Sequence, residues 1–304
     1  MKKLLFLSLL FLSSTLLIQT SLQAQNLKPY TIGAETTGSV ADVKTKVIDA
    51  LKTNGISVIG QYTPASDQNR KLIAITSSDL KSAVNRVGGM TGFAAALRVA
   101  VTKEGEKIII SYTTPEYWGN AYFRSDYGKV AANYTALATK LKAALNPLGT
   151  NGGTTFGSKK GISASGLQKY HYMMGMPYFD DPIELNSFDS YDKAVETIDA
   201  NLSKGVSNLR KVYTVTLKSK NIKLYGIGLS GSDGESSFMP TIDGGSPKHT
   251  AFLPYEILVM GNKAYMLHGR YRIALSFPDL SMGTFMKIVS TPGNIEDLLT
   301  TATE

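Results

Sequence analysis

The chain has 304 residues, 43% hydrophobic and 18% charged, a composition typical of a folded protein of about two domains. Cysteine is absent, so disulfides, thiol chemistry and a lipid-modified cysteine are excluded. The net charge of +8 is spread along the chain, without the clusters of basic and aromatic residues that typify nucleic-acid binding, and we expect no nucleic acid as a partner.

The first 24 residues have the pattern of a secretory signal peptide. Lys2-Lys3 precede an apolar run from Leu4 to Ile18, and a polar stretch follows that ends at Ala24. Leu22 is a poor residue just before a cleavage site, so the position of the cut stays open. We expect a periplasmic or secreted protein, not a lipoprotein, without a transmembrane span once the signal is removed. The alternative is a retained membrane anchor.

The first lobe, residues 26–147, opens with a clearly marked helix. Ser39 is a good N-cap, and apolar residues follow at helical spacing until Asn54-Gly55 provide a left-handed stop. Alternating apolar residues then predict strands, and an aromatic loop at 115–123 precedes a closing helix. The predicted segments are helix 39–55, strands 56–62 and 71–76, a short helix 78–87, strands 93–102 and 107–113, and helix 129–145.

A connector, residues 148–186, follows the first lobe. Residues 148–165 are rich in Gly, Ser, Thr and Lys, which predicts a linker or mobile loop. Residues 170–181 are chemically dense, with one of the three histidines and three of the ten methionines of the chain. We interpret this stretch mainly as the seam that fixes one lobe against the other, because methionine adapts to irregular surfaces.

The second lobe, residues 187–304, repeats the order of the first. The predicted segments are helix 190–205, strands 209–217 and 222–229, a hairpin over 252–268 that 270–276 extends, and helix 295–301. We interpret the two lobes as a diverged internal duplication, with two unrelated lobes as the alternative. The predicted fold class is therefore α+β, with two similar lobes.

Short motifs in both lobes resemble a bacterial family called domain of unknown function 302. In the second lobe they are Leu253 to Val259 (LPYEILV), a Gly-Asn turn, Pro278-Asp279 and a final helix. In the first lobe they are residues 39–55, 56–62 and 92–113. The resemblance implies a tandem pair of domains, each a curved antiparallel sheet packed against helices. It implies no catalytic residue, since no activity is established for the family.

Catalytic motifs are missing from the sequence. It has no Gly-x-Ser-x-Gly elbow, phosphate loop or His-Glu-x-x-His pair, and the spacing of Gly226, Gly228 and Gly231 is a chance match to a dinucleotide fingerprint. We therefore predict no catalytic residue and no particular cofactor. If the protein is an enzyme of an unrecognised type, its acid–base candidates are His171, His268 and Glu256.

Two groups of residues are candidates for ligand binding. Tyr117, Trp118 and Tyr122 of the aromatic loop suit a small apolar or stacking ligand, although the loop is also suited to covering a sheet. Arg98 and Glu256 fall at equivalent strand positions, so they meet or line a groove if the lobes pack pseudo-symmetrically. The alternative is an exposed sheet face. With His171, these complete the predicted ligand-binding set.

The connector also carries a candidate metal site. His171, Met173, Met174 and Met176 supply an imidazole and three thioethers, ligands that suit Cu(I), and His171, Met173 and Met176 are the predicted set. The leading functional hypothesis is an exported, non-enzymatic binding or accessory protein with its ligand between the lobes or under the aromatic loop. The alternatives are a periplasmic copper-type metal-handling protein and an unrecognised enzyme.

Overall fold

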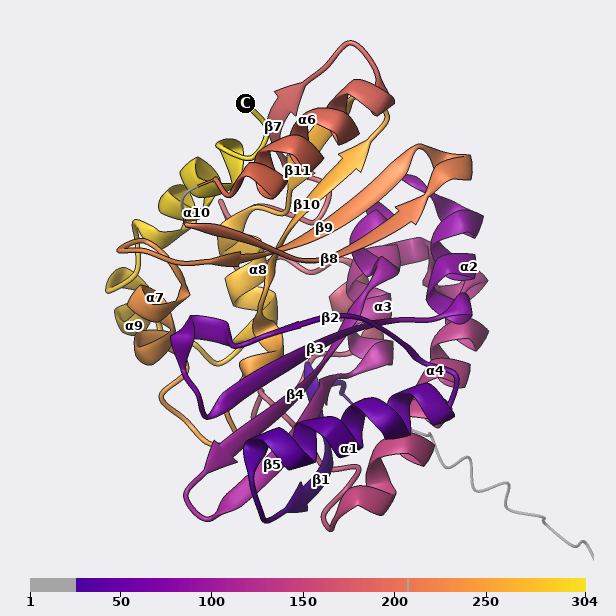
Figure 1. Ribbon diagram of the computed structural model, residues 1–304, viewed down its shortest axis with the longest axis vertical. Coiled ribbons are helices and arrows are strands. Elements are labelled where there is room, and N and C mark those ends of the chain that lie inside the picture. The colour runs from indigo at the N-terminus through magenta and orange to yellow at the C-terminus, as the bar shows by residue number, and fades with distance from the viewer. Residues whose placement is uncertain (1–25, 207) are drawn as a thin grey trace, which may run out of the picture.

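The computed structural model describes residues 26–206 and 208–304 (Figure 1). The predicted signal peptide, residues 1–24, lies outside this part of the chain. Among the described residues, no helix is both long enough and apolar enough to cross a membrane. The chain forms two antiparallel sheets with helices packed on them, which confirms the predicted α+β class.

The first sheet has six strands in the order β2-β3-β4-β5-β1-β6. Its strands are β1 (Tyr30–Thr36), β2 (Ser57–Tyr62), β3 (Arg70–Thr76), β4 (Leu97–Glu104), β5 (Lys107–Thr113) and β6 (Thr155–Phe156). The helices of this half are α1 (Val40–Thr53), α2 (Ser78–Val87), α3 (Pro115–Phe123), α4 (Ala131–Leu145) and the short α5 (Ala164–Gln168). In Figure 1 this sheet and α1 fill the lower half of the molecule.

The second sheet has five strands in the order β7-β11-β10-β9-β8. Its strands are β7 (Ile183–Ser187), β8 (Leu209–Leu217), β9 (Ile222–Leu229), β10 (Tyr255–Met260) and β11 (Lys263–Met266). The helices are α6 (Tyr191–Lys204), α7 (Glu235–Ile242), α8 (Gly269–Ser276), α9 (Met282–Met286) and α10 (Thr291–Thr300). Read from β8 to β7, the order matches that of the first sheet from β2 to β1.

The first helix of each lobe forms where its caps predict. The Ser39 hydroxyl accepts a hydrogen bond from the backbone N–H of Asp42, and Ser190 does the same for Lys193. Gly205 ends α6 in the left-handed conformation with φ of 78°. Each helix follows the first strand of its sheet and precedes the strand that forms the sheet's far edge. The two lobes therefore share a helix position as well as a strand order.

Several predicted segments are wrong. The aromatic loop 115–123 is the helix α3, and the strand extension 270–276 is the helix α8. Nearly every residue of both helices is buried, so neither shows the amphipathic spacing that identifies a surface helix. The segment 148–165, predicted as a linker, adds β6 to the first sheet beside β1.

The two sheets meet where β2 packs against β8. Each strand has a β-bulge at this contact, between Val58 and Gly60 in β2 and between Lys211 and Tyr213 in β8. A Cβ on Gly60 would lie 2.1 Å from the carbonyl oxygen of Val212, so only glycine fits there. The apolar core that contains most of the first lobe also includes side chains from β8, β9 and α8. The lobes therefore share a core.

Candidate functional site

Arg98 and Glu256 meet in the buried centre of the molecule. In the first sheet, Arg98 pairs with Ala74, which pairs with the residue just after the bulge in β2. In the second sheet, Glu256 pairs with Gly226, which pairs with the residue just after the bulge in β8. The register is thus equivalent in the two sheets. The Nη2 atom of Arg98 lies 2.5 Å from Oε1 of Glu256, and both side chains are 1% exposed.

Arg272 completes this charge network from α8. Its Nη1 lies 3.0 Å from Oε2 of Glu256, and its Nη2 donates to the carbonyl oxygens of Phe252 and Pro254, each at 2.8 Å. The hydroxyl of Tyr213 donates to Oε1 of Glu256 at 2.5 Å. Burial is the largest single effect and lowers the pKa of Arg98, but Glu256, Tyr213 and Tyr122 together raise it above its usual value, so the guanidinium stays charged. One carboxylate thus joins two buried guanidinium groups.

The aromatic residues of α3 pack in the same core. Trp118 Nε1 donates to the carbonyl of Pro29 at 2.8 Å, and the Tyr117 hydroxyl donates to the carbonyl of Leu275 at 2.7 Å. Burial raises the pKa of Tyr122 to about 12, against the opposing effect of Arg272. These side chains are at most 2% exposed, so a ligand reaches them only if the sheets part. Their predicted role in ligand binding, and that of the central charges, stays a prediction.

The predicted metal ligands of the connector point in different directions. His171 stacks on Tyr178, with ring centroids 4.4 Å apart. Met173 and Met174 are exposed, Met174 to 93%. Met176 instead lines an apolar pocket against the second lobe. Among the described residues, no group of three His, Asp or Glu side chains is placed to hold a metal ion.

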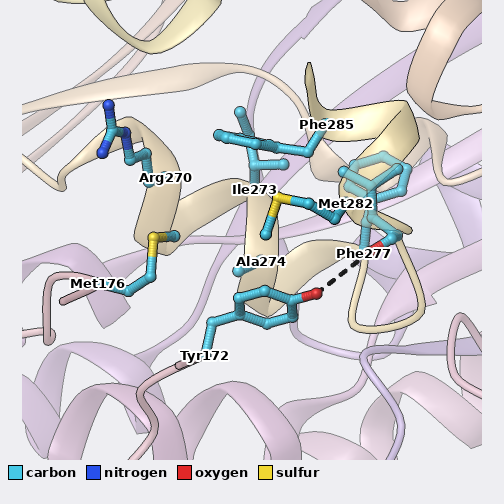
Figure 2. Close-up of a pocket in the computed structure, with 9 residues that line it drawn as sticks. Tyr172, Met176, Arg270, Ile273, Ala274, Phe277, Met282 and Phe285 are labelled. Carbon is cyan, nitrogen blue, oxygen red and sulfur yellow. Dashed lines mark hydrogen bonds between the residues drawn. The ribbon is translucent and has the colours of Figure 1, made fainter. Parts of the chain in front are cut away.

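That apolar pocket is the candidate site (Figure 2). The connector forms one wall, α8 the floor and α9 the opposite wall. Its lining is Tyr172, Met176, Arg270, Ile273, Ala274, Phe277, Leu280, Met282 and Phe285. The cavity volume is about 30 Å³, which is room for one or two waters. Tyr172 borders the pocket, and its hydroxyl donates to the carbonyl of Leu280 at 3.4 Å.

The walls of the pocket are apolar side chains that are partly exposed. Met282 is 45% exposed, and Met286 on the same helix is 56% exposed. Arg270 supplies the charge in the lining and stands at the edge beside Met176 (Figure 2). Within residues 26–206 and 208–304, Arg270 forms no ion pair with a carboxylate. Such a surface suits an apolar ligand or a ligand that combines an apolar part with a negative charge.

Sequence reasoning found one side of this pocket and missed the other. The connector stood out through its density of methionine and tyrosine. The residues of α8 and α9 gave little signal, although Met282 and Met286 lie four positions apart. Such a pair of methionines on one helix face is a signal from which the opposite wall could have been found.

A second polar cluster was also missed. Asp243 is buried and accepts hydrogen bonds from the guanidinium of Arg70 and from His249, whose Nδ1 lies 3.0 Å away. This resembles the orienting pair of a catalytic histidine. However, the Nε2 atom of His249 is itself buried, and a Cβ on Gly157 would lie 3.1 Å from it. The ring therefore has no open position for a reacting group.

The fold and the pocket together define an α+β protein with two similar lobes and an apolar surface site. No family model matches the chain, and no curated protein does so either. One solved structure similar to it is that of an uncharacterised conserved protein of the domain of unknown function 302 family from Bacillus stearothermophilus. The two share 13% identity with a TM-score of 0.32, over 37% of this chain and 93% of the other.

Proposed function

We propose that the protein is a non-enzymatic binding protein that holds a small apolar molecule in the pocket between the connector and α8–α9. The observation that carries this proposal is an apolar concave surface at which Tyr172 and Met282 stay partly open to solvent. Single exposed apolar side chains are common on protein surfaces, whereas apolar side chains gathered in one concave surface mark interaction sites. In keeping with the apparent signal peptide, we propose a periplasmic or secreted location for the mature protein.

The small volume of the pocket is compatible with binding because its walls can move. Met176, Met282 and Tyr172 are partly exposed. The methionine side chain is unbranched and has three rotatable bonds, so it adapts its shape easily. Rotation of these side chains widens the pocket without disturbing a strand. The same adaptability makes methionine-lined surfaces tolerant of ligand shape, so we expect broad selectivity among apolar ligands.

The matching strand orders of the two sheets support the proposal of a tandem pair related to the domain of unknown function 302 family. This proposal concerns ancestry and fold. The boundaries proposed for its parts are 26–147 for the first lobe, 148–186 for the connector and 187–304 for the second lobe.

A second candidate function is the handling of a soft metal ion such as Cu(I). It is favoured by one observation, that Met176 and Met282 line the same pocket from distant segments (Figure 2). Thioether sulfurs are ligands for Cu(I). His171 would then lie outside the metal site, since it is stacked on Tyr178.

Binding of the neutral fluorescent probe phenylnaphthylamine tests the main proposal. We predict that the protein enhances the probe's fluorescence and that Ala274→Phe abolishes this, because the phenyl ring fills the floor of the pocket. Ala132→Phe is the matched control, since Ala132 is exposed on α4. If Ala274→Phe fails to fold, Met282→Gln tests the same wall and should lower affinity by about tenfold, or 1.4 kcal/mol. Unchanged binding in both variants would refute the proposal.

Silver titration distinguishes the metal candidate. Ag(I) is a stable substitute for Cu(I), and native mass spectrometry would count the ions bound. The metal candidate predicts one bound ion in the wild type and none in Met176→Leu, which keeps the side-chain volume and removes the sulfur. An unchanged protein mass after addition of Ag(I) would rule it out.

A further inference from the structure

We infer that the ligand is a single-chain amphiphile with an anionic head, and that its head binds in a basic cleft on the other side of Tyr172. This inference rests on the proposed function, because the apolar chain occupies the pocket described above. The cleft has a volume of about 290 Å³ and is lined by Tyr172 itself and by Lys159, Lys160, Tyr170 and Asp279. A single side chain, Tyr172, thus borders both the apolar pocket and the basic cleft.

The cleft is suited to an anion by its charges. Lys159 and Lys160 are both exposed, and neither forms an ion pair with a carboxylate in the described part of the chain. They belong to the segment Gly157-Ser-Lys-Lys-Gly161, whose two glycines adopt positive φ values of 93° and 68°.

An internal carboxylate already uses this segment. The backbone N–H of Lys159 donates to Oδ2 of Asp279 at 2.5 Å, and the Ser158 hydroxyl donates to Oδ1 at 3.3 Å. The Ser158 hydroxyl also accepts from the backbone N–H of Gly161 at 3.0 Å. Asp279 therefore shows the chemistry that the segment recognises, which is a carboxylate held by backbone and hydroxyl donors.

Tyr172 forms a weak barrier between the cleft and the pocket. Its side chain is 38% exposed, and its hydrogen bond to the carbonyl of Leu280 is 3.4 Å long, well beyond the usual O–H···O distance. Leu280 directly follows Asp279. A ligand head that replaces Asp279 on the segment 157–161 therefore binds next to the hydrogen bond between Tyr172 and Leu280. When this bond breaks, rotation of Tyr172 joins the basic cleft to the apolar pocket.

Arg270 is the other cation that could receive the head. It stands alone at the Met176 edge of the pocket, whereas the cleft offers two lysines together with backbone donors. Figure 2 shows Arg270 across the pocket from Phe277. We therefore place the head at the lysines, and Arg270→Gln tests the alternative position.

Displacement of phenylnaphthylamine by two matched amphiphiles tests the inference. We expect dodecanoate to displace the probe at a concentration about tenfold or more below that of dodecanol, the difference that one ion pair with 1.4 kcal/mol would give. In the variant Lys159→Gln/Lys160→Gln the two should become equal within about twofold, with probe affinity unchanged. Arg270→Gln should keep the tenfold preference. Asp279→Asn should raise the affinity for dodecanoate several-fold, because it removes the competing carboxylate.

The outcomes separate the two proposals. Absence of probe binding refutes the proposed function itself. Probe binding with equal displacement by both amphiphiles, or a preference that survives the lysine substitutions, overturns the head site alone. A preference lost in Arg270→Gln instead places the head at the opposite edge and also overturns it. Inorganic phosphate at the same concentrations should neither displace the probe nor weaken dodecanoate. If it weakens dodecanoate, the cleft is a site for free anions and the inference fails.

Discussion

Glu235 is a buried carboxyl group that links the two lobes. Its Oε1 accepts from the Tyr62 hydroxyl at 2.9 Å, and its Oε2 accepts from the backbone N–H of Ala65 at 2.8 Å, both in the first lobe. It also accepts from the N–H of Leu229 at 3.2 Å. Burial raises the pKa of Glu235 to about 7, although these three donors lower it. This carboxyl group is therefore harder to ionise in the folded protein than in the unfolded chain.

We predict that this raised pKa makes stability fall with pH. Below about pH 4.5 the group is protonated in both states, and its contribution to stability is complete. As pH rises from about 4.5 to about 7, the carboxyl group ionises in the unfolded chain but stays protonated in the folded protein. The free energy of unfolding therefore falls by up to about 3 kcal/mol. Urea unfolding of wild type and Glu235→Gln between pH 4 and pH 8 measures this. The difference between the two curves should slope across that range, and parallel curves would contradict the prediction.

At the scale of single residues, Arg98 and Glu256 show how much of the buried charge network could be predicted from the sequence. Their equivalence followed from the repeated order of segments, and it led to the expectation that they meet if the lobes pack pseudo-symmetrically. In the structure, Nη2 of Arg98 lies 2.5 Å from Oε1 of Glu256. Arg272 was not anticipated, because it lies in a segment predicted as a strand and folded as α8. A helix that is buried on all sides has no periodic polar face from which to recognise it.

Among the elements, the contact between β2 and β8 depends on one glycine. We predict that Gly60→Ala lowers the free energy of unfolding by about 1–3 kcal/mol, because its Cβ would meet the Val212 carbonyl oxygen and two bulged strands would have to separate. Gly128→Ala is the control, since a Cβ there meets nothing within 4 Å. Equal stability of the two variants in denaturant unfolding would show that β2 and β8 are loosely packed.

The candidate pocket illustrates why sites are harder to predict than helices. The helices α1 and α6 were predicted from their caps and apolar spacing, which are local in sequence. The pocket needs the connector near Tyr172 to lie against α8 and α9, about a hundred residues further on. Only the tertiary fold brings these segments together, so the sequence indicates one wall at most. The same holds for the cleft, where Lys159 meets Asp279.

On the scale of the whole molecule, each lobe contributes side chains to the core of the other. Tyr213, Leu258 and Tyr271 of the second lobe belong to the core cluster of the first, and Tyr62 and Leu72 of the first belong to that of the second. The buried ion pair of Arg98 and Glu256 also spans the lobes. Removing either lobe would expose apolar surface and leave an unpaired charge, which is strongly destabilising.

We therefore predict a single cooperative unfolding transition for the chain without its first 24 residues. Calorimetry should give a calorimetric enthalpy equal to the van't Hoff enthalpy. Residues 26–147 expressed alone should lack the dispersed amide NMR spectrum of a folded domain. The strand β2 would lose its contact with β8, and Arg98 in β4 would lose its ion pair with Glu256. A well-dispersed spectrum from this fragment, or two separate transitions in the full chain, would show that each lobe folds independently. In that case the contact between the lobes is a docking surface, and the ion pair of Arg98 and Glu256 at its centre forms after folding.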